Sequence, residues 1–330
     1  MQRLLYILAL ACSAALFSAC ATPTTAVQGE SLAETLARAD REFEARQYGQ
    51  ALVAYRMVAF ASSNARDAAP FVESASQVAS VLALQGLPSD AHSWLAQAQE
   101  RATPDAPRAW TRFLLGRGLV DWKEGRDGEA LANFSELFQF CFLHGETARA
   151  IQASQMASVV SRGAEQIEWA RRGIQTAAAS GKPGWEGPLW ANLGWLLDAR
   201  GLTDEALEAF ERALSLAKQS EATRIGRARA EWAYAHALRK AGRSEDAQRA
   251  LDYLFDVLSG LYARERTPVV AEYFGRTLMD LAELDAQSGA TLRAQERFRA
   301  ARARLIEAGA VEGAPELLAE LDRRLAELER

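Results

Sequence analysis

The chain has 330 residues, of which 49% are hydrophobic, and it contains few β-branched runs of the kind that strands favour. With 22 glycines but only 9 prolines, this composition indicates an all-α fold. Lysine and arginine are interspersed with aspartate and glutamate to a formal net charge of −5, so no overall positive field points to nucleic acid as a partner.

Residues 1–20 have the pattern of an export signal. Arg3 precedes an apolar run from Leu4 to about Ala19, which is too short for a comfortable membrane span. The closing LFSAC resembles the lipobox of bacterial lipoproteins, with Phe17 where that family usually has an aliphatic residue. This resemblance implies cleavage before Cys20 and acylation of that cysteine, which anchors the chain in a membrane. An ordinary cleaved signal or an uncleaved anchor is the alternative.

The residues after Cys20 extend this interpretation. Ala21 rather than aspartate follows it, which by resemblance to the enterobacterial sorting pattern points to the outer membrane, facing the periplasm. The next stretch, ATPTTAVQGES, is polar and without periodicity, as in a flexible tether. We therefore expect a lipoprotein signal peptide over 1–19, and a lipidated cysteine and tether over 20–30. Cys141 lies in the apolar segment LFQFCFLH, which predicts a buried, unreactive thiol.

Residues 188–214 predict a hairpin of two helices. Apolar residues at 190, 193 and 197, and then at 206, 207, 210 and 214, follow the three- and four-residue steps of helical faces. Between the two runs, Gly201 can adopt a positive φ at the end of the first helix. Thr203 is the expected N-cap of the second helix.

The second half of this hairpin recurs along the chain. Each copy has an alanine, an aromatic or aliphatic residue four positions later, and an apolar residue three further on. The alanines are Ala51, Ala91, Ala130, Ala170, Ala206, Ala247 and Ala294. A glycine lies five residues upstream in most copies, at Gly86, Gly125, Gly201, Gly242 and Gly289. Such self-similarity predicts a repeat array.

The repeated unit resembles the tetratricopeptide repeat (TPR). Residues 187–220 carry the full pattern, with Trp190, Leu193, Gly194, Leu197, Ala206, Phe210 and Ala213. The small-residue position of other copies holds Gly118, Ala79 and Ala235. Successive alanines are 36 to 47 residues apart, against about 34 in the family, so the pitch of the superhelix is not carried over.

The resemblance covers about residues 31 to 310. It implies an all-α, TPR-like α-solenoid, a right-handed superhelix of about seven helical hairpins, over 31–312. In such arrays each hairpin buries its apolar faces against its neighbours. The final segment, PELLAELDRRLAELER, has leucines on one face and charges on the other, which predicts a C-terminal capping helix over 313–330.

Little in the sequence suggests catalysis. The three histidines are far apart, and there is no glycine-rich phosphate loop or metal-ligand motif. We therefore expect no enzymatic activity, no cofactor and no metal.

A partner-binding groove is the more informative expectation. Trp122, Trp195 and Trp232 fall on first-helix positions that, by the resemblance, line the concave groove of TPR proteins, although packing between repeats is the alternative. Seven cations lie near them in the same frame: Arg112, Lys123, Arg229, His236, Arg239, Lys240 and Arg276. A basic groove with an aromatic floor suits an acidic or C-terminal peptide. The alternative is that these cations coat a solvated helix face.

Together these features predict a membrane-anchored TPR lipoprotein. It would act as a protein–protein interaction scaffold or assembly adaptor in the bacterial cell envelope, as a pilotin or an envelope-complex assembly factor does. Its partner would be another envelope protein or a peptide segment. The alternative is a periplasmic solenoid that binds a small molecule or a glycan through the groove aromatics.

Overall fold

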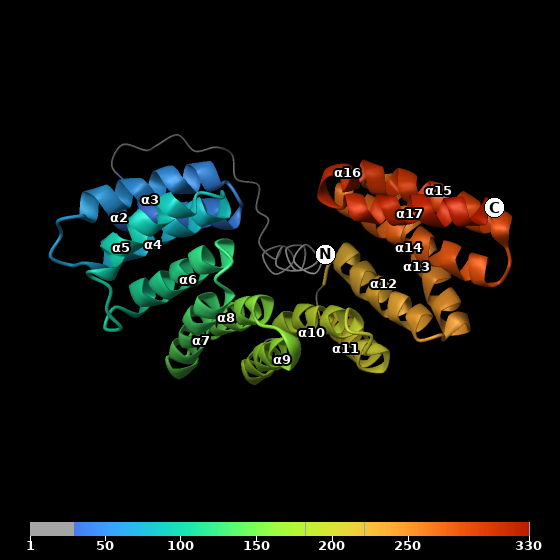
Figure 1. The fold of residues 1–330 in the computed structure, drawn as a ribbon, viewed down its shortest axis with the longest axis horizontal. Helices are drawn as coiled ribbons and strands as arrows, with labels where there is room; N and C mark the ends of the chain where they lie inside the picture. Colours follow the sequence, from blue (N-terminus) through green and yellow to red (C-terminus); the bar gives the residue numbers. More distant parts are fainter. Residues whose placement is uncertain (1–29, 182, 221, 330) are drawn as a thin grey trace. The chain divides into compact units, whose positions relative to one another are not determined.

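The structure, a computed structural model, describes residues 30–181, 183–220 and 222–329. All regular secondary structure in these ranges is helical (Figure 1), which confirms the all-α prediction. None of the helices in these ranges has the length and apolar character needed to cross a membrane. The predicted signal peptide, Cys20 and the predicted tether up to residue 29 lie outside the described residues.

Seven consecutive helical hairpins make up most of the described chain, as the repeat pattern predicts. They are α2 (Leu32–Glu44) with α3 (Tyr48–Ser62), α4 (Ala69–Leu84) with α5 (Pro88–Gln99), α6 (Pro107–Lys123) with α7 (Asp127–Leu143), α8 (Thr147–Val160) with α9 (Gly163–Ala179), α10 (Pro183–Asp198) with α11 (Thr203–Gln219), α12 (Arg224–Lys240) with α13 (Ser244–Arg264), and α14 (Pro268–Gln287) with α15 (Thr291–Glu307). Each repeat alanine lies in the second helix of its hairpin. The short α16 (Ala310–Gly313) and then α17 (Pro315–Leu328) follow.

The chain divides into two compact units between Gly181 and Lys182. Unit 1 contains the first four hairpins, and unit 2 contains the last three together with α16 and α17. The sequence shows no change of composition at this division. At the end of unit 2, α17 buries Leu318 and Leu321 in a cluster with α14 and α15, as expected of a cap.

The turn inside the hairpins uses glycine as predicted. All five predicted glycines have a positive φ, between 71° and 79°. In the fifth hairpin the N–H of Leu202 then donates to the carbonyl of Leu197 at 3.1 Å, which is the Schellman geometry. The N-cap prediction is wrong, because Thr203 is the first residue of α11 and the cap is Leu202, which has no capping side chain. The turn places Leu202, with ψ 66°, directly before the helix.

In the third and fifth hairpins the two helices approach closely at the predicted small-residue position. A Cβ added to Gly118 would lie 2.4 Å from the ring of Phe134, and one added to Gly194 would lie 2.7 Å from the ring of Phe210. Both phenylalanine side chains are fully buried. The predicted burial of Cys141 is also confirmed, and it raises the pKa of that thiol to about 11.

We predict that Gly118→Ala lowers the free energy of unfolding by about 1–3 kcal/mol, because the enclosed ring of Phe134 cannot move away from the added methyl group. Gly128→Ala in α7 is the matched control, since nothing lies within 4 Å of its added Cβ. That change should stabilise the chain by up to about 1 kcal/mol through helix propensity. Urea unfolding followed by circular dichroism measures both. Equal effects of the two substitutions would contradict the close approach.

Candidate functional site

A cluster of aromatic and charged side chains connects the first helices of the three hairpins in unit 2. Its centre is α12, where Trp232, His236 and Arg239 are spaced by four and then three residues and so share one face. Neighbouring helices on the two sides add Trp195 from α10 and Asp280 from α14. We call these five residues, with Tyr273 and Arg276 of α14, the unit 2 cluster.

Asp280 is the hydrogen-bonding centre of the unit 2 cluster. Its side chain is only 3% exposed and accepts hydrogen bonds from Nε1 of Trp232 at 2.9 Å and Nε of Arg239 at 2.7 Å. Nδ1 of His236 lies 3.0 Å from the same carboxylate. Burial alone would raise the pKa of Asp280, but His236 and Arg239 outweigh it and hold the pKa at about 2. The carboxylate is therefore ionised at neutral pH.

Aromatic rings form the other part of the unit 2 cluster. Trp195 stacks on Trp232 with ring centroids 5.3 Å apart, and Tyr273 meets the ring of Trp232 edge-on at 5.5 Å. The guanidinium of Arg276 lies 5.1 Å from the centre of the Trp232 ring, within the range of a cation–π interaction. Trp232 is 7% exposed, so it packs between repeats, which was the alternative to an exposed anchor. Trp195 is half-buried.

Six of the nine predicted groove residues lie on these first helices: Trp195, Arg229, Trp232, His236, Arg239 and Lys240. Several of the cations have carboxylate partners that the sequence analysis did not single out. Besides the contacts to Asp280, Nζ of Lys240 lies 2.7 Å from Asp198, and Nε of Arg276 lies 2.9 Å from Glu272. The local signal for Asp280 is a lone carboxylate in the apolar run TLMDLA.

The other three predicted groove residues, Arg112, Trp122 and Lys123, lie in unit 1. Arg112 is 5% exposed and donates to both carboxylate oxygens of Asp40, at 2.8 and 2.6 Å. Its Nε lies 2.9 Å from Glu73. Arg112 is therefore a buried structural ion pair rather than an exposed groove cation. Lys123 lies over the ring of Trp122 on the same helix, 4.6 Å from its centre.

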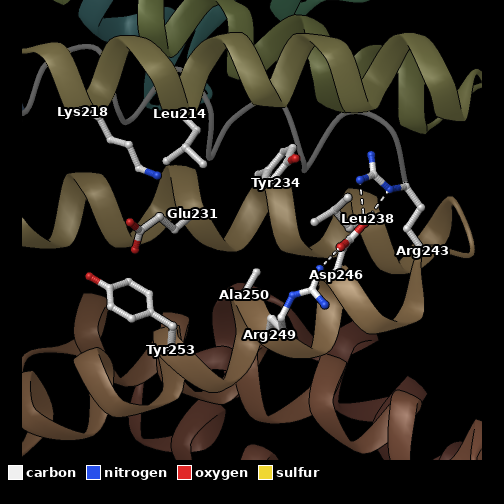
Figure 2. A pocket seen from close by; sticks show the side chains of 10 residues that line it. All are labelled: Leu214, Lys218, Glu231, Tyr234, Leu238, Arg243, Asp246, Arg249, Ala250 and Tyr253. Carbon is white, nitrogen blue, oxygen red and sulfur yellow. Dashed lines mark hydrogen bonds and ion pairs between the residues drawn. The ribbon is translucent and has the colours of Figure 1, made fainter.

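An open groove with a volume of about 390 Å³ lies between α11, α12 and α13 (Figure 2). This groove was not predicted from the sequence. Lys218, Glu231 and Tyr253 gather at one end, while Asp246 bonds to Arg243 and Arg249 at the other. Burial raises the pKa of Glu231, although the charges of Lys218 and Arg227 oppose this. Nowhere in the described residues do three or more His, Cys, Asp or Glu side chains form a group that could hold a metal ion.

Comparison with known proteins identifies the fold. No protein-family model matches the sequence, and no curated protein matches it. The TPR-sensor STAND (signal transduction ATPase) protein of Pyrococcus horikoshii is similar with a TM-score of 0.68 at 13% identity, over 89% of this chain and 44% of that one. The apo form of RapI gives a TM-score of 0.67 at 12% identity, over 90% and 86%.

A third similar structure is the C-terminal part of a TPR protein from Cytophaga hutchinsonii, with a TM-score of 0.52 at 13% identity, over 84% of this chain and 99% of that one. Identities this low establish architecture only. The described part of the chain therefore has the TPR-like α-solenoid fold that the repeat pattern implies.

We predict that Asp280 makes unfolding sensitive to acid. Its pKa is held at about 2 in the folded chain, below the ordinary 3.8, so its contribution to stability is complete above about pH 4. As the pH falls to about 2, the unfolded chain binds this proton first, and the folded state should lose roughly 2 kcal/mol.

The matched variant is Asp280→Asn, measured by urea unfolding across the same pH range. At neutral pH it should cost about 3 kcal/mol, because the guanidinium of Arg239 loses its buried counter-charge. Its loss of stability between pH 4 and 2 should be roughly 2 kcal/mol smaller than that of the parent. Parallel pH profiles for the two proteins would contradict this role of Asp280.

Proposed function

We propose that the chain is a scaffold or assembly adaptor that binds another protein, or a peptide segment of one, through the first helices of unit 2. The observation that carries this proposal is the fixed arrangement of the unit 2 cluster. Asp280 holds Trp232, His236 and Arg239 in defined orientations before any partner arrives. Side chains already ordered in this way lose less conformational freedom on binding.

The exposed parts of the unit 2 cluster have the chemistry of a peptide anchor. Trp195 presents a half-buried indole, and tryptophan and arginine are the residue types that most often dominate binding energy. Arg239 donates to Asp280 through Nε, and no hydrogen bond joins its two terminal nitrogens to a residue in the described part of the chain. Those nitrogens can take a carboxylate of an acidic partner side chain or C-terminus as a bidentate pair.

The cellular setting in this proposal comes from the sequence. Acylation of Cys20 would anchor the chain in a bacterial membrane, with the outer membrane facing the periplasm as the expected site. Tethering then raises the effective concentration of the solenoid beside other envelope components. In this proposal the chain is a pilotin-like adaptor or an assembly factor of an envelope complex.

A second candidate function is the binding of a small molecule or glycan. The groove between α11, α12 and α13 favours it, because a volume of about 390 Å³ falls within the range of small-ligand sites, roughly 300–1,000 Å³. Tyr234 and Tyr253 line this groove. None of the predicted groove tryptophans, Trp122, Trp195 and Trp232, lines this groove.

Pull-down from solubilised envelope separates the two functions. We expect Trp195→Ala combined with Arg239→Lys to reduce co-purifying partner proteins by at least about tenfold, since each change removes an anchor contact. The lysine keeps a positive charge beside Asp280, and the thermal midpoint checks the fold. The control is Tyr253→Ala combined with Arg249→Glu, in the groove between α11, α12 and α13. It should leave the partner proteins bound. Unchanged partners in the first variant would refute the peptide-binding proposal.

The anchor has its own test, which is metabolic labelling with radioactive palmitate. The wild-type chain should take up label, and Cys20→Ala should lose it, because the acyl chains attach to that cysteine. Globomycin, which blocks lipoprotein signal cleavage, should cause the uncleaved form to accumulate. A wild-type chain that takes up no label would disprove the anchor. The pull-down would still test partner binding independently.

A further inference from the structure

The outward face of α3, in unit 1, is apolar. Val53, Met57 and Phe60 are 60%, 50% and 68% exposed. Their spacing of four and three residues puts all three on one face of the helix. We call this face the α3 stripe. Arg56 is the only charged residue in α3.

Other hairpins do not share this feature. The α3 stripe occupies the positions two, six and nine residues after the repeat alanine. In α11 the same three positions hold Glu208, Arg212 and Ser215, and in the second hairpin they hold Ser93, Gln97 and the C-cap residue Glu100. These two hairpins therefore have polar side chains at all three positions, and apolar side chains there in α3 indicate a different contact.

The apolar surface continues from α3 onto α5. The ring of Phe60 meets the ring of Trp94 edge-on, with centroids 5.7 Å apart. Trp94 itself is partly buried against the core of unit 1. The stripe and Trp94 thus form a continuous surface of aliphatic and aromatic groups.

The chemistry of this surface favours lipid over protein. Protein interfaces carry about one hydrogen bond per 100–200 Å² and a polar rim. The α3 stripe has no hydrogen-bonding side chain among its three members, so it offers a protein partner little to fix orientation. Arg56, beside the stripe, is a residue type that reaches from an apolar surface toward anionic headgroups.

The position of α3 in the chain also points to the membrane. Nine residues lie between Cys20 and Glu30, and the ten Cα-to-Cα steps across them span at most about 35 Å when extended. The 13 residues of α2 add about 20 Å before the turn into α3. An acylated Cys20 would therefore keep the first hairpin within reach of the bilayer surface.

We propose that the α3 stripe, with Trp94, contacts the lipid bilayer in which Cys20 is anchored. This rests on the lipid anchor of the proposed function. The apolar side chains enter the boundary between headgroups and acyl chains, as the apolar face of an interfacial helix does. The contact holds the first hairpin against the membrane surface.

The test uses the acylated chain reconstituted into vesicles of phosphatidylethanolamine and phosphatidylglycerol. Met57→Cys carries an environment-sensitive fluorophore, and Arg212→Cys, at the equivalent exposed position of α11, is the matched control. Cys141 is buried and escapes labelling. We expect brominated lipids to quench the probe at position 57 roughly twofold, with a blue-shifted emission, and to leave the probe at position 212 unchanged.

A second preparation separates this inference from the anchor. A histidine tag that replaces residues 1–20, and with them Cys12 and Cys20, holds the chain on nickel-chelating lipid, so the stripe can be tested without acylation. If the tagged chain shows the quenching but the wild type takes up no palmitate, only the anchor fails. If the chain is bound to vesicles but the fluorophores at positions 57 and 212 both show the emission of a probe in water and no quenching, the lipid contact is refuted. A blue shift at position 57 that needs no lipid and grows with protein concentration also refutes it, because the α3 stripe then contacts a second copy of the chain.

Discussion

The fold depends on the close approach of the two helices in each hairpin. Where the first helix has Gly118 or Gly194, the facing phenylalanine ring occupies the space that a side chain would need. Each hairpin can then present flat apolar faces to its neighbours, and stacking removes those faces from water. The first helices follow one another along each unit as a result, and this is what brings residues from different repeats into one cluster.

Much of the fold was predictable because the determinants are local. The repeat alanines, the glycines with positive φ and the small residues all act within one hairpin, so their spacing in the sequence is their spacing in the structure. Thr203 shows the limit of this reasoning, since a backbone turn made its expected cap unnecessary. The composition does not change at the division after Gly181. The division reflects contacts between residues far apart in the sequence, which are denser within each unit than between the two.

The candidate site was predictable only in part. The position of each residue within the repeat placed Trp195 and the cations of α12 on first helices. It does not indicate which of these cations pair with a carboxylate. That depends on partners far along the chain: Asp280 lies 48 residues from Trp232, and Asp40 lies 72 residues from Arg112. Asp40 and Glu73 pair with Arg112, and Asp280 pairs with Arg239, but no local pattern reveals either pairing. Long-range pairing is the information that a single sequence lacks here.

The bonds of Asp280 have a mechanical consequence for unit 2. Solenoids flex by small displacements at each junction between hairpins, and one carboxylate fastened to three side chains of α12 prevents α14 from sliding past that helix. Between α10 and α12 the links are the stacked rings of Trp195 and Trp232 and the ion pair of Lys240 with Asp198 at 2.7 Å. The two junctions of unit 2 are therefore held differently: a buried carboxylate joins α12 to α14, whereas a ring contact and a more exposed ion pair join α10 to α12.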